Sequence, residues 1–170
     1  MNEFDVVIIG GGPGGYAAAI RCSQLGLSVA LAEQEALGGT CLNWGCIPTK
    51  SLLQSADLYQ QILGAETFGI SVGDVTFDLA KMVDQSRLAA QQLSQGVAQL
   101  MKKNKVKIFS GEASITGIGE VHVNGESLIT DSIIVASGAE QKSLGPIAID
   151  GQNIWGAREA MTPSKLPKKL

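Results

Sequence analysis

The stretch "DVVIIGGGPGGYAAAIRCSQLGLSVALAE", residues 5–33, joins two short apolar runs through a glycine cluster and an alanine-rich segment. Residues 4–9 predict a short buried strand that ends at glycine. Residues 13–26 predict a helix of small residues closed by Gly26, and residues 27–33 predict a second strand. Strand, glycine turn, helix and strand make a βαβ unit, so we expect two parallel strands with a right-handed crossover.

The glycine cluster fits a nucleotide-binding turn. Gly10, Gly12 and Gly15 match G-x-G-x-x-G between the predicted strand and helix. Gly10 permits the tight turn, Gly12 leaves room for a diphosphate, and Gly15 allows close helix packing. The helix N-terminus offers N–H groups and partial positive charge to phosphates. Glu33 closes the second strand, where a carboxylate can accept hydrogen bonds from ribose hydroxyls and repel a 2′-phosphate. We therefore expect a dinucleotide other than NADP, with a turn that serves only packing as the alternative.

The rest of the chain predicts two further helices, a small antiparallel meander, a last buried strand and a linker. Positive charge at "KKNK" suits the C-terminus of the second helix. In chain order, the helices are 47–63 and 77–104, the meander strands 106–109, 113–115, 120–123 and 127–129, the last strand 131–139 and the linker 161–170.

The composition is that of a globular protein. Of 170 residues, 45% are hydrophobic and 17% charged, and the net charge of −3 provides no basic field for nucleic acid. The apolar run Val6–Ile9 near the start is too short for a secretion signal or a membrane span. We therefore expect a cytoplasmic protein without nucleic-acid or membrane partners.

A second informative stretch is "GGTCLNWGCIPTK", residues 38–50, which contains Cys41 and Cys46. In a reducing compartment a close cysteine pair is more often catalytic or metal-binding than structural. On a regular helix, residues five positions apart have Cα atoms roughly 8–9 Å from each other. A disulfide needs a Cα–Cα distance of less than about 7 Å. If the pair is bridged, the helix must be broken, and Gly45 and Pro48 provide the irregularity.

Three interpretations of the cysteine pair are open. A zinc site needs about four ligands, and the only other candidates are Cys22 and His122. A structural staple around so small a loop would stabilise little and would be reduced in the cytosol. A redox-active pair needs an electron source, which a neighbouring flavin can provide. The residues favour this third interpretation.

These motifs resemble the flavin-dependent disulfide reductases of the glutathione reductase type. "GGTCLNWGCIPTK" carries the resemblance together with "DVVIIGGGPGGYAAAIRCSQLG", "IIVASGA" and "TPSKLPKKL", so it covers essentially the whole chain. It implies an α/β, Rossmann-like FAD-binding domain over residues 1–150, with a parallel sheet and a small antiparallel β-meander. Residues 151–170 would then be a linker toward an NAD-binding domain beyond this chain.

The resemblance also implies roles for individual residues. Cys46 matches the cysteine that faces the flavin, Cys41 the one that exchanges with a dithiol substrate, and Lys50 a lysine near the flavin ring. With these three as catalytic residues, the expected FAD-binding positions are Gly10, Gly12, Pro13, Gly14, Gly15, Glu33, Gly39, Thr40, Cys41, Cys46, Lys50, Ala113, Ala136, Ser137 and Gly138. Trp44 departs from the family pattern, where valine is common at this position.

Within this family, the cysteine segment is most similar to the members that oxidise dihydrolipoyl groups of acyltransferase complexes. Such an enzyme is a homodimer that transfers electrons from the dithiol through the disulfide and FAD to NAD⁺. The NAD site, the central domain and a histidine–glutamate pair would lie outside this chain, so we expect the chain alone to be inactive. A mercuric or glutathione reductase type of enzyme and a non-catalytic FAD-binding module are the alternatives.

Overall fold

The computed structural model describes residues 2–169. One six-stranded sheet, in the order β3-β2-β1-β6-β5-β4, contains all the named strands. In chain order the elements are β1 (Asn2–Ile9), α1 (Pro13–Gln24), β2 (Val29–Glu33), α2 (Gly39–Trp44), α3 (Cys46–Leu63), the 3₁₀ helix η1 (Ala65–Phe68), α4 (Leu79–Lys103), β3 (Lys107–Ser110), β4 (Ala113–Gly117), β5 (Glu120–Val123), β6 (Glu126–Val135) and α5 (Ala157–Met161).

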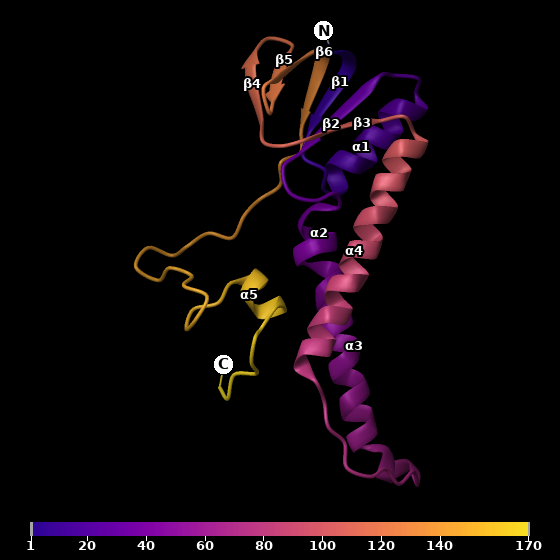
Figure 1. Ribbon diagram of the computed structural model, residues 1–170, viewed down its shortest axis with the longest axis vertical. Coiled ribbons are helices and arrows are strands. Elements are labelled where there is room, and N and C mark those ends of the chain that lie inside the picture. Colours follow the sequence, from indigo (N-terminus) through magenta and orange to yellow (C-terminus); the bar gives the residue numbers. More distant parts are fainter. Residues whose placement is uncertain (1, 170) are drawn as a thin grey trace. The chain divides into compact units, whose positions relative to one another are not determined.

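The sheet has a parallel part and an antiparallel part. β3, β2, β1 and β6 run parallel to one another, with β1 between β2 and β6. β4 and β5 continue the sheet beyond β6 with antiparallel pairing. The α/β fold class expected from the sequence, a parallel sheet with a small antiparallel addition, is therefore confirmed, and Figure 1 shows α1 running beside the parallel strands.

Alternation along the strands explains how both faces of the sheet are covered. On β1, Val6 and Ile8 belong to one cluster, which includes Ala19 of α1 and Met101 of α4. Val7, between them in sequence, belongs to a second cluster on the opposite face. Period-two alternation places successive side chains on opposite faces, so each inner strand is buried on both sides. The second cluster consists of Val7, Ala30, Ala32, Phe109, Val121, Val123 and Leu128.

Two strand predictions were wrong in detail. The run 106–109 was expected in the antiparallel meander, but β3 pairs parallel with β2 at the sheet edge. The runs 127–129 and 131–139 were expected as two strands, but they form the single strand β6, which ends at Val135. Asp131 is an exposed position within an alternating strand. A polar residue at an exposed position does not interrupt a strand, although in the sequence it separates two apolar runs and suggests two strands.

Contacts between residues divide the chain into two compact units. The first contains residues up to Asn43 and Gln91–Glu140, and therefore the whole sheet with α1 and all of α2 except its last residue, Trp44. The second contains Trp44–Ala90 and the residues from Gln141 onward, and therefore α3, η1 and α5. α4 begins in the second unit and ends in the first.

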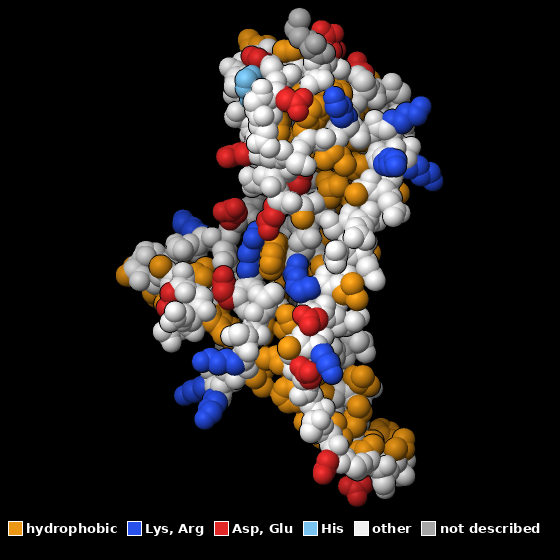
Figure 2. Space-filling model, in the orientation of Figure 1, with side chains coloured by type: hydrophobic (Ala, Val, Ile, Leu, Met, Phe, Trp, Pro, Cys, Tyr) orange, Lys and Arg blue, Asp and Glu red, His pale blue; other side chains and the backbone are white. Residues whose placement is uncertain are grey.

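The end of the second unit at η1 is rich in exposed apolar side chains. Phe68 is 84% exposed, and Figure 2 shows hydrophobic side chains grouped where Figure 1 places the segment after α3. One ring contact orders part of this region, an edge-to-face pair of Tyr59 and Phe77 with centroids 5.5 Å apart. The other exposed apolar residues here are Leu63, Ile70 and Val72.

Candidate functional site

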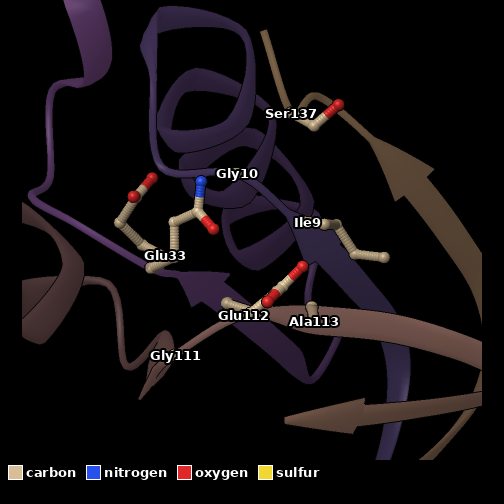
Figure 3. A pocket seen from close by; sticks show the side chains of 9 residues that line it. Ile9, Gly10, Glu33, Gly111, Glu112, Ala113 and Ser137 are labelled. Carbon is tan, nitrogen blue, oxygen red and sulfur yellow. The ribbon is translucent and has the colours of Figure 1, made fainter.

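The parallel strands β1, β2, β3 and β6 all end on the same side of the sheet, and a pocket lies beside these carboxyl-terminal ends. In a doubly wound sheet, ligands bind at these ends, where the strand order reverses on either side of the first strand. β1 is that strand, since β2 and β6 flank it. The pocket has a volume of about 230 Å³ and is shown in Figure 3. Its lining residues are Ile9, Gly10, Ala32, Glu33, Gln34, Gly111, Glu112, Ala113 and Ser137.

The glycine turn follows β1 directly, and its glycines have different structural requirements. Gly10 has a φ of +103°, and a Cβ on it would lie 2.3 Å from the carbonyl oxygen of Ala136. A Cβ on Gly15 would lie 1.7 Å from the carbonyl oxygen of Gly10. A Cβ on Gly12 would meet no atom closer than 3.7 Å. The protein itself therefore requires Gly10 and Gly15, whereas the space beside Gly12 is open to a ligand.

α1 begins at this open position. Gly12 is its N-cap without a side-chain cap, and Pro13 is its first residue. Proline at this position lacks an N–H group that would be unpaired in any case. The N–H groups of the first turn have no partners within the helix and carry the positive end of the helix dipole. This is the local arrangement that a diphosphate requires.

Glu33 organises the turn from the end of β2. Its carboxylate accepts hydrogen bonds from the backbone N–H of Gly11 at 2.6 Å and from that of Glu35 at 2.7 Å. The backbone carbonyl of Glu33 accepts from the N–H of Gly111 at 2.8 Å. Glu33 thus links the glycine turn to the loop before β4. Both features belong to the pocket wall that Figure 3 shows.

The cysteine segment starts against the same turn. The backbone N–H of Gly38 donates to the carbonyl oxygen of Gly11 at 2.8 Å. A Cβ on Gly39, where φ is +56°, would lie 2.7 Å from the Cα of Gly12. Asn43 is buried, and its amide donates to the carbonyl oxygens of Leu37 and Gly39. α2 therefore begins at the glycine turn, and Gly39 requires the absence of a side chain.

Cys41 and Cys46 form a disulfide, and the helix is broken between them. α2 ends at Trp44, Gly45 has φ −147° and ψ −110°, and α3 starts at Cys46. The two cysteines are disulfide-bonded, whereas Cys22 is free. The expected break is confirmed at Gly45, whereas Pro48, which was also expected to contribute to it, lies within α3. Pro48 is the third residue of α3 and fits its first turn, where no N–H is needed.

Cys46 and Lys50 occupy neighbouring positions on α3. Both side chains are exposed, and residues four apart lie on the same helix face. Cys41 is half-buried on α2. Within residues 2–169, no group of three or more histidine, cysteine, aspartate and glutamate side chains could hold a metal ion.

The pocket brings together several residues that the sequence predicts and others that it missed. Gly10, Glu33, Ala113 and Ser137 were expected and all line it. The backbone N–H of Ala136 donates to Ile9 at 2.8 Å, next to Gly10. Pro13, Gly14, Thr40 and Gly138 are not among its lining residues. Sequence analysis missed Ile9, Ala32, Gln34, Gly111 and Glu112, and the only available signal was their position at predicted strand ends.

Comparisons with known proteins agree with this arrangement. The family model described as pyridine nucleotide-disulphide oxidoreductase matches residues 4–170. The chain belongs to this family. The resemblance inferred from the cysteine and glycine segments is thereby confirmed.

Several curated proteins that are similar to this chain are dihydrolipoyl dehydrogenases. The one from Zymomonas mobilis is 47% identical over 99% of this chain, and the one from Chlorobaculum tepidum is 44% identical over 99%. A mitochondrial dihydrolipoyl dehydrogenase of Pisum sativum is 43% identical over 99%. The chain spans 37% of the length of the first two relatives and 35% of the third. In the described part of the chain, no helix has the length and apolar character needed to cross a membrane.

Proposed function

We propose that this chain is the FAD-binding part of a dihydrolipoyl dehydrogenase, in which the Cys41–Cys46 disulfide accepts electrons from a dihydrolipoyl dithiol. The observation that carries the proposal is the start of α2 against the glycine turn. The segment containing Cys41 is thereby attached to the backbone that would bind the cofactor diphosphate.

The residues present fit the ADP half of FAD. The diphosphate would lie beside Gly12, where nothing in the protein occupies the space of a side chain. The N-terminus of α1 would stabilise its negative charge. Glu33 has a carboxylate in the pocket wall for a ribose, and Ala113 and Ser137 line the same pocket. When bound at these residues, FAD would supply the acceptor for the electron pair that the two cysteines receive from the dithiol.

The chain's own step is thiol–disulfide exchange. A substrate thiolate attacks the Sγ atom of Cys41 and forms a mixed disulfide, and the Cys41–Cys46 bond breaks to leave a thiolate on Cys46. The second substrate thiol then displaces Cys41 and closes the substrate disulfide. One dithiol is oxidised and loses two electrons and two protons: the two cysteines gain both electrons, Cys41 takes one proton as it leaves as a thiol, and the other proton, lost from the attacking thiol, goes to solvent. Lys50, one turn after Cys46, contributes positive charge that favours the thiolate.

A visible spectrum of the purified chain tests the proposal. We expect FAD to bind, and a long-wavelength band to appear after addition of two electrons per chain and to be absent in Cys46→Ser. FAD binding without such a band would favour a non-catalytic binding module. A chain that binds no FAD while its circular dichroism shows a folded protein would contradict the proposal. The chain alone should produce no NADH from dihydrolipoamide and NAD⁺.

A further inference from the structure

Two guanidinium groups lie over the indole ring of Trp44. The Cζ atom of Arg87 is 4.3 Å from the ring centroid, and that of Arg158 is 4.7 Å from it. Both distances are within the range of favourable cation–π interactions, for which tryptophan is the best acceptor. We call Trp44, Arg87 and Arg158 the Trp44 cluster. All three residues belong to the second compact unit.

The cluster joins three elements. Trp44 ends α2, Arg87 lies on α4 and Arg158 lies on α5. A second contact holds α5 at the start of α3, since the hydroxyl group of Thr49 lies 3.9 Å from the sulfur of Met161. Trp44 therefore contacts two segments, α4 and α5, that are far apart in sequence.

α5 is itself firmly built, although it is short. The carboxylate of Glu159 accepts a hydrogen bond from the N–H of Gly156 at 2.8 Å, and the side chain of Gln141 accepts from Ala157 at 2.9 Å. Asp150 closes the preceding loop by accepting backbone N–H groups from residues 152–154 at 2.8–2.9 Å. These hydrogen bonds fix the conformation of the helix that carries Arg158.

The position of Trp44 connects the cluster to the disulfide. Gly45 alone separates Trp44 from Cys46, and the backbone leaves the helical conformation at Gly45. The disulfide closes across this break. Whether two thiols re-form a disulfide depends on how well the folded chain holds their sulfurs within bonding distance.

We propose that the Trp44 cluster is a positioning device for the disulfide. Arg87 and Arg158 fix the indole of Trp44, and the indole fixes the break at Gly45 in the geometry that keeps the two sulfurs within reach of each other. Trp44, Arg87 and Arg158 are positioning residues, and the inference does not depend on the proposed cofactor.

Positioning and charge make opposite predictions. If the cluster positions the sulfurs, its loss favours the dithiol, because the two thiols become harder to rejoin. If the arginines act only through charge, their loss favours the disulfide, because positive charge stabilises the thiolate of the reduced form. Substitution of arginine by lysine separates the two effects, since lysine keeps the charge but lacks the planar group that stacks on an aromatic ring.

The test is a redox equilibrium of the whole 170-residue chain with dithiothreitol. In this reaction the two thiols of dithiothreitol become a cyclic disulfide, the Cys41–Cys46 bond breaks, and each cysteine gains one electron and one proton. A Cys22→Ala background removes the free cysteine. The fraction of reduced chain is measured by acid quenching, alkylation and mass spectrometry at one fixed pH. Arg21→Lys, at an exposed position of α1, is the matched control.

We expect the equilibrium constant to shift toward the dithiol by about threefold in Arg87→Lys and in Arg158→Lys and by about tenfold in Trp44→Ala. Trp44→Phe should recover part of the parent value, and Arg21→Lys should equal it. Parent values in both lysine variants, or a shift of Trp44→Ala toward the disulfide, would overturn the proposal. If circular dichroism shows that Trp44→Ala does not fold, the lysine variants and Trp44→Phe decide the question.

Discussion

Gly12 and Gly15 belong to the same motif, and the structure predicts opposite consequences for adding one methyl group to each. In Gly15→Ala the new Cβ would lie 1.7 Å from the carbonyl oxygen of Gly10, whereas ordinary contacts begin at 3.4 Å. The turn and the helix must then separate by roughly 1.7 Å, and overpacking of this extent against backbone costs about 3 kcal/mol or more of unfolding free energy.

Gly12→Ala should leave the fold intact. The nearest atom to its Cβ is 3.7 Å away, and the φ of −73° suits any residue. Replacement of glycine by alanine at an unstrained position restricts the unfolded chain and stabilises the folded one by about 0.4–1 kcal/mol. For a chain of this size, Gly12→Ala should raise the Tm by about 1–4 °C and Gly15→Ala should lower it by about 6 °C or more.

The same methyl group at Gly12 should impair FAD binding, because it fills the space proposed for the diphosphate. We expect the affinity, measured by quenching of FAD fluorescence, to fall by about tenfold or more in Gly12→Ala. Thermal unfolding of the apoprotein provides the control for folding. A Gly12→Ala protein that is less stable than Gly15→Ala would refute the packing argument. One that binds FAD like the parent would refute the placement of the diphosphate.

Three further outcomes follow from the structure. Glu33→Gln replaces one carboxylate oxygen by an N–H donor that faces a backbone N–H, so urea denaturation should show a free energy of unfolding lower by about 1–2 kcal/mol. An unchanged urea midpoint would mean that the hydrogen bonds to Glu33 do not stabilise the protein. Leu31→Ala, at a fully buried site of the sheet, should cost about 2–5 kcal/mol in the same assay, and a loss under about 1 kcal/mol would contradict the packing described. The backbone N–H groups of Ile154, Gln152 and Asn153 hold the pKa of Asp150 below its usual 3.8. The charged Asp150 carboxylate therefore stabilises the fold fully above pH 3.8, and this stabilisation is lost as the pH falls through the lower folded-state pKa. The amide NMR shifts of residues 152–154 should change only in that acidic range. In Asp150→Asn these shifts should not change with pH.

Local patterns were sufficient to predict the first strand, the glycine turn, the first helix and the second strand. Their signals lie within a few residues of each other, and the observed elements end within a few residues of the expected ones. The broken helix at Gly45 could also be predicted, because the geometry of a disulfide is incompatible with a regular helix at that spacing.

The features that sequence analysis missed depend on distant partners. The parallel placement of β3 is decided by α4, which returns the chain to the free edge of β2, and no residue of β3 indicates the direction of its partner. α5 has only five residues and owes its N-terminus partly to Gln141. Gln34 and Glu112 line the pocket because the paired strands β2 and β3 end side by side, at Glu33 and Ser110. The roles assigned to Cys41, Cys46, Lys50 and the FAD-contacting residues stay predictions.

The pairing of β1 has a consequence for the order of events in the cell. β1 is synthesised before the other strands of the sheet, yet one of its two neighbours is β6, at residues 126–135. A strand rich in valine and isoleucine therefore keeps one hydrogen-bonding edge unpaired until residues 126–135 have been translated. Such long-range pairing is slow to form and exposes the waiting strand to wrong partners. We therefore expect chaperones that bind exposed apolar strands during translation to raise the yield of native protein.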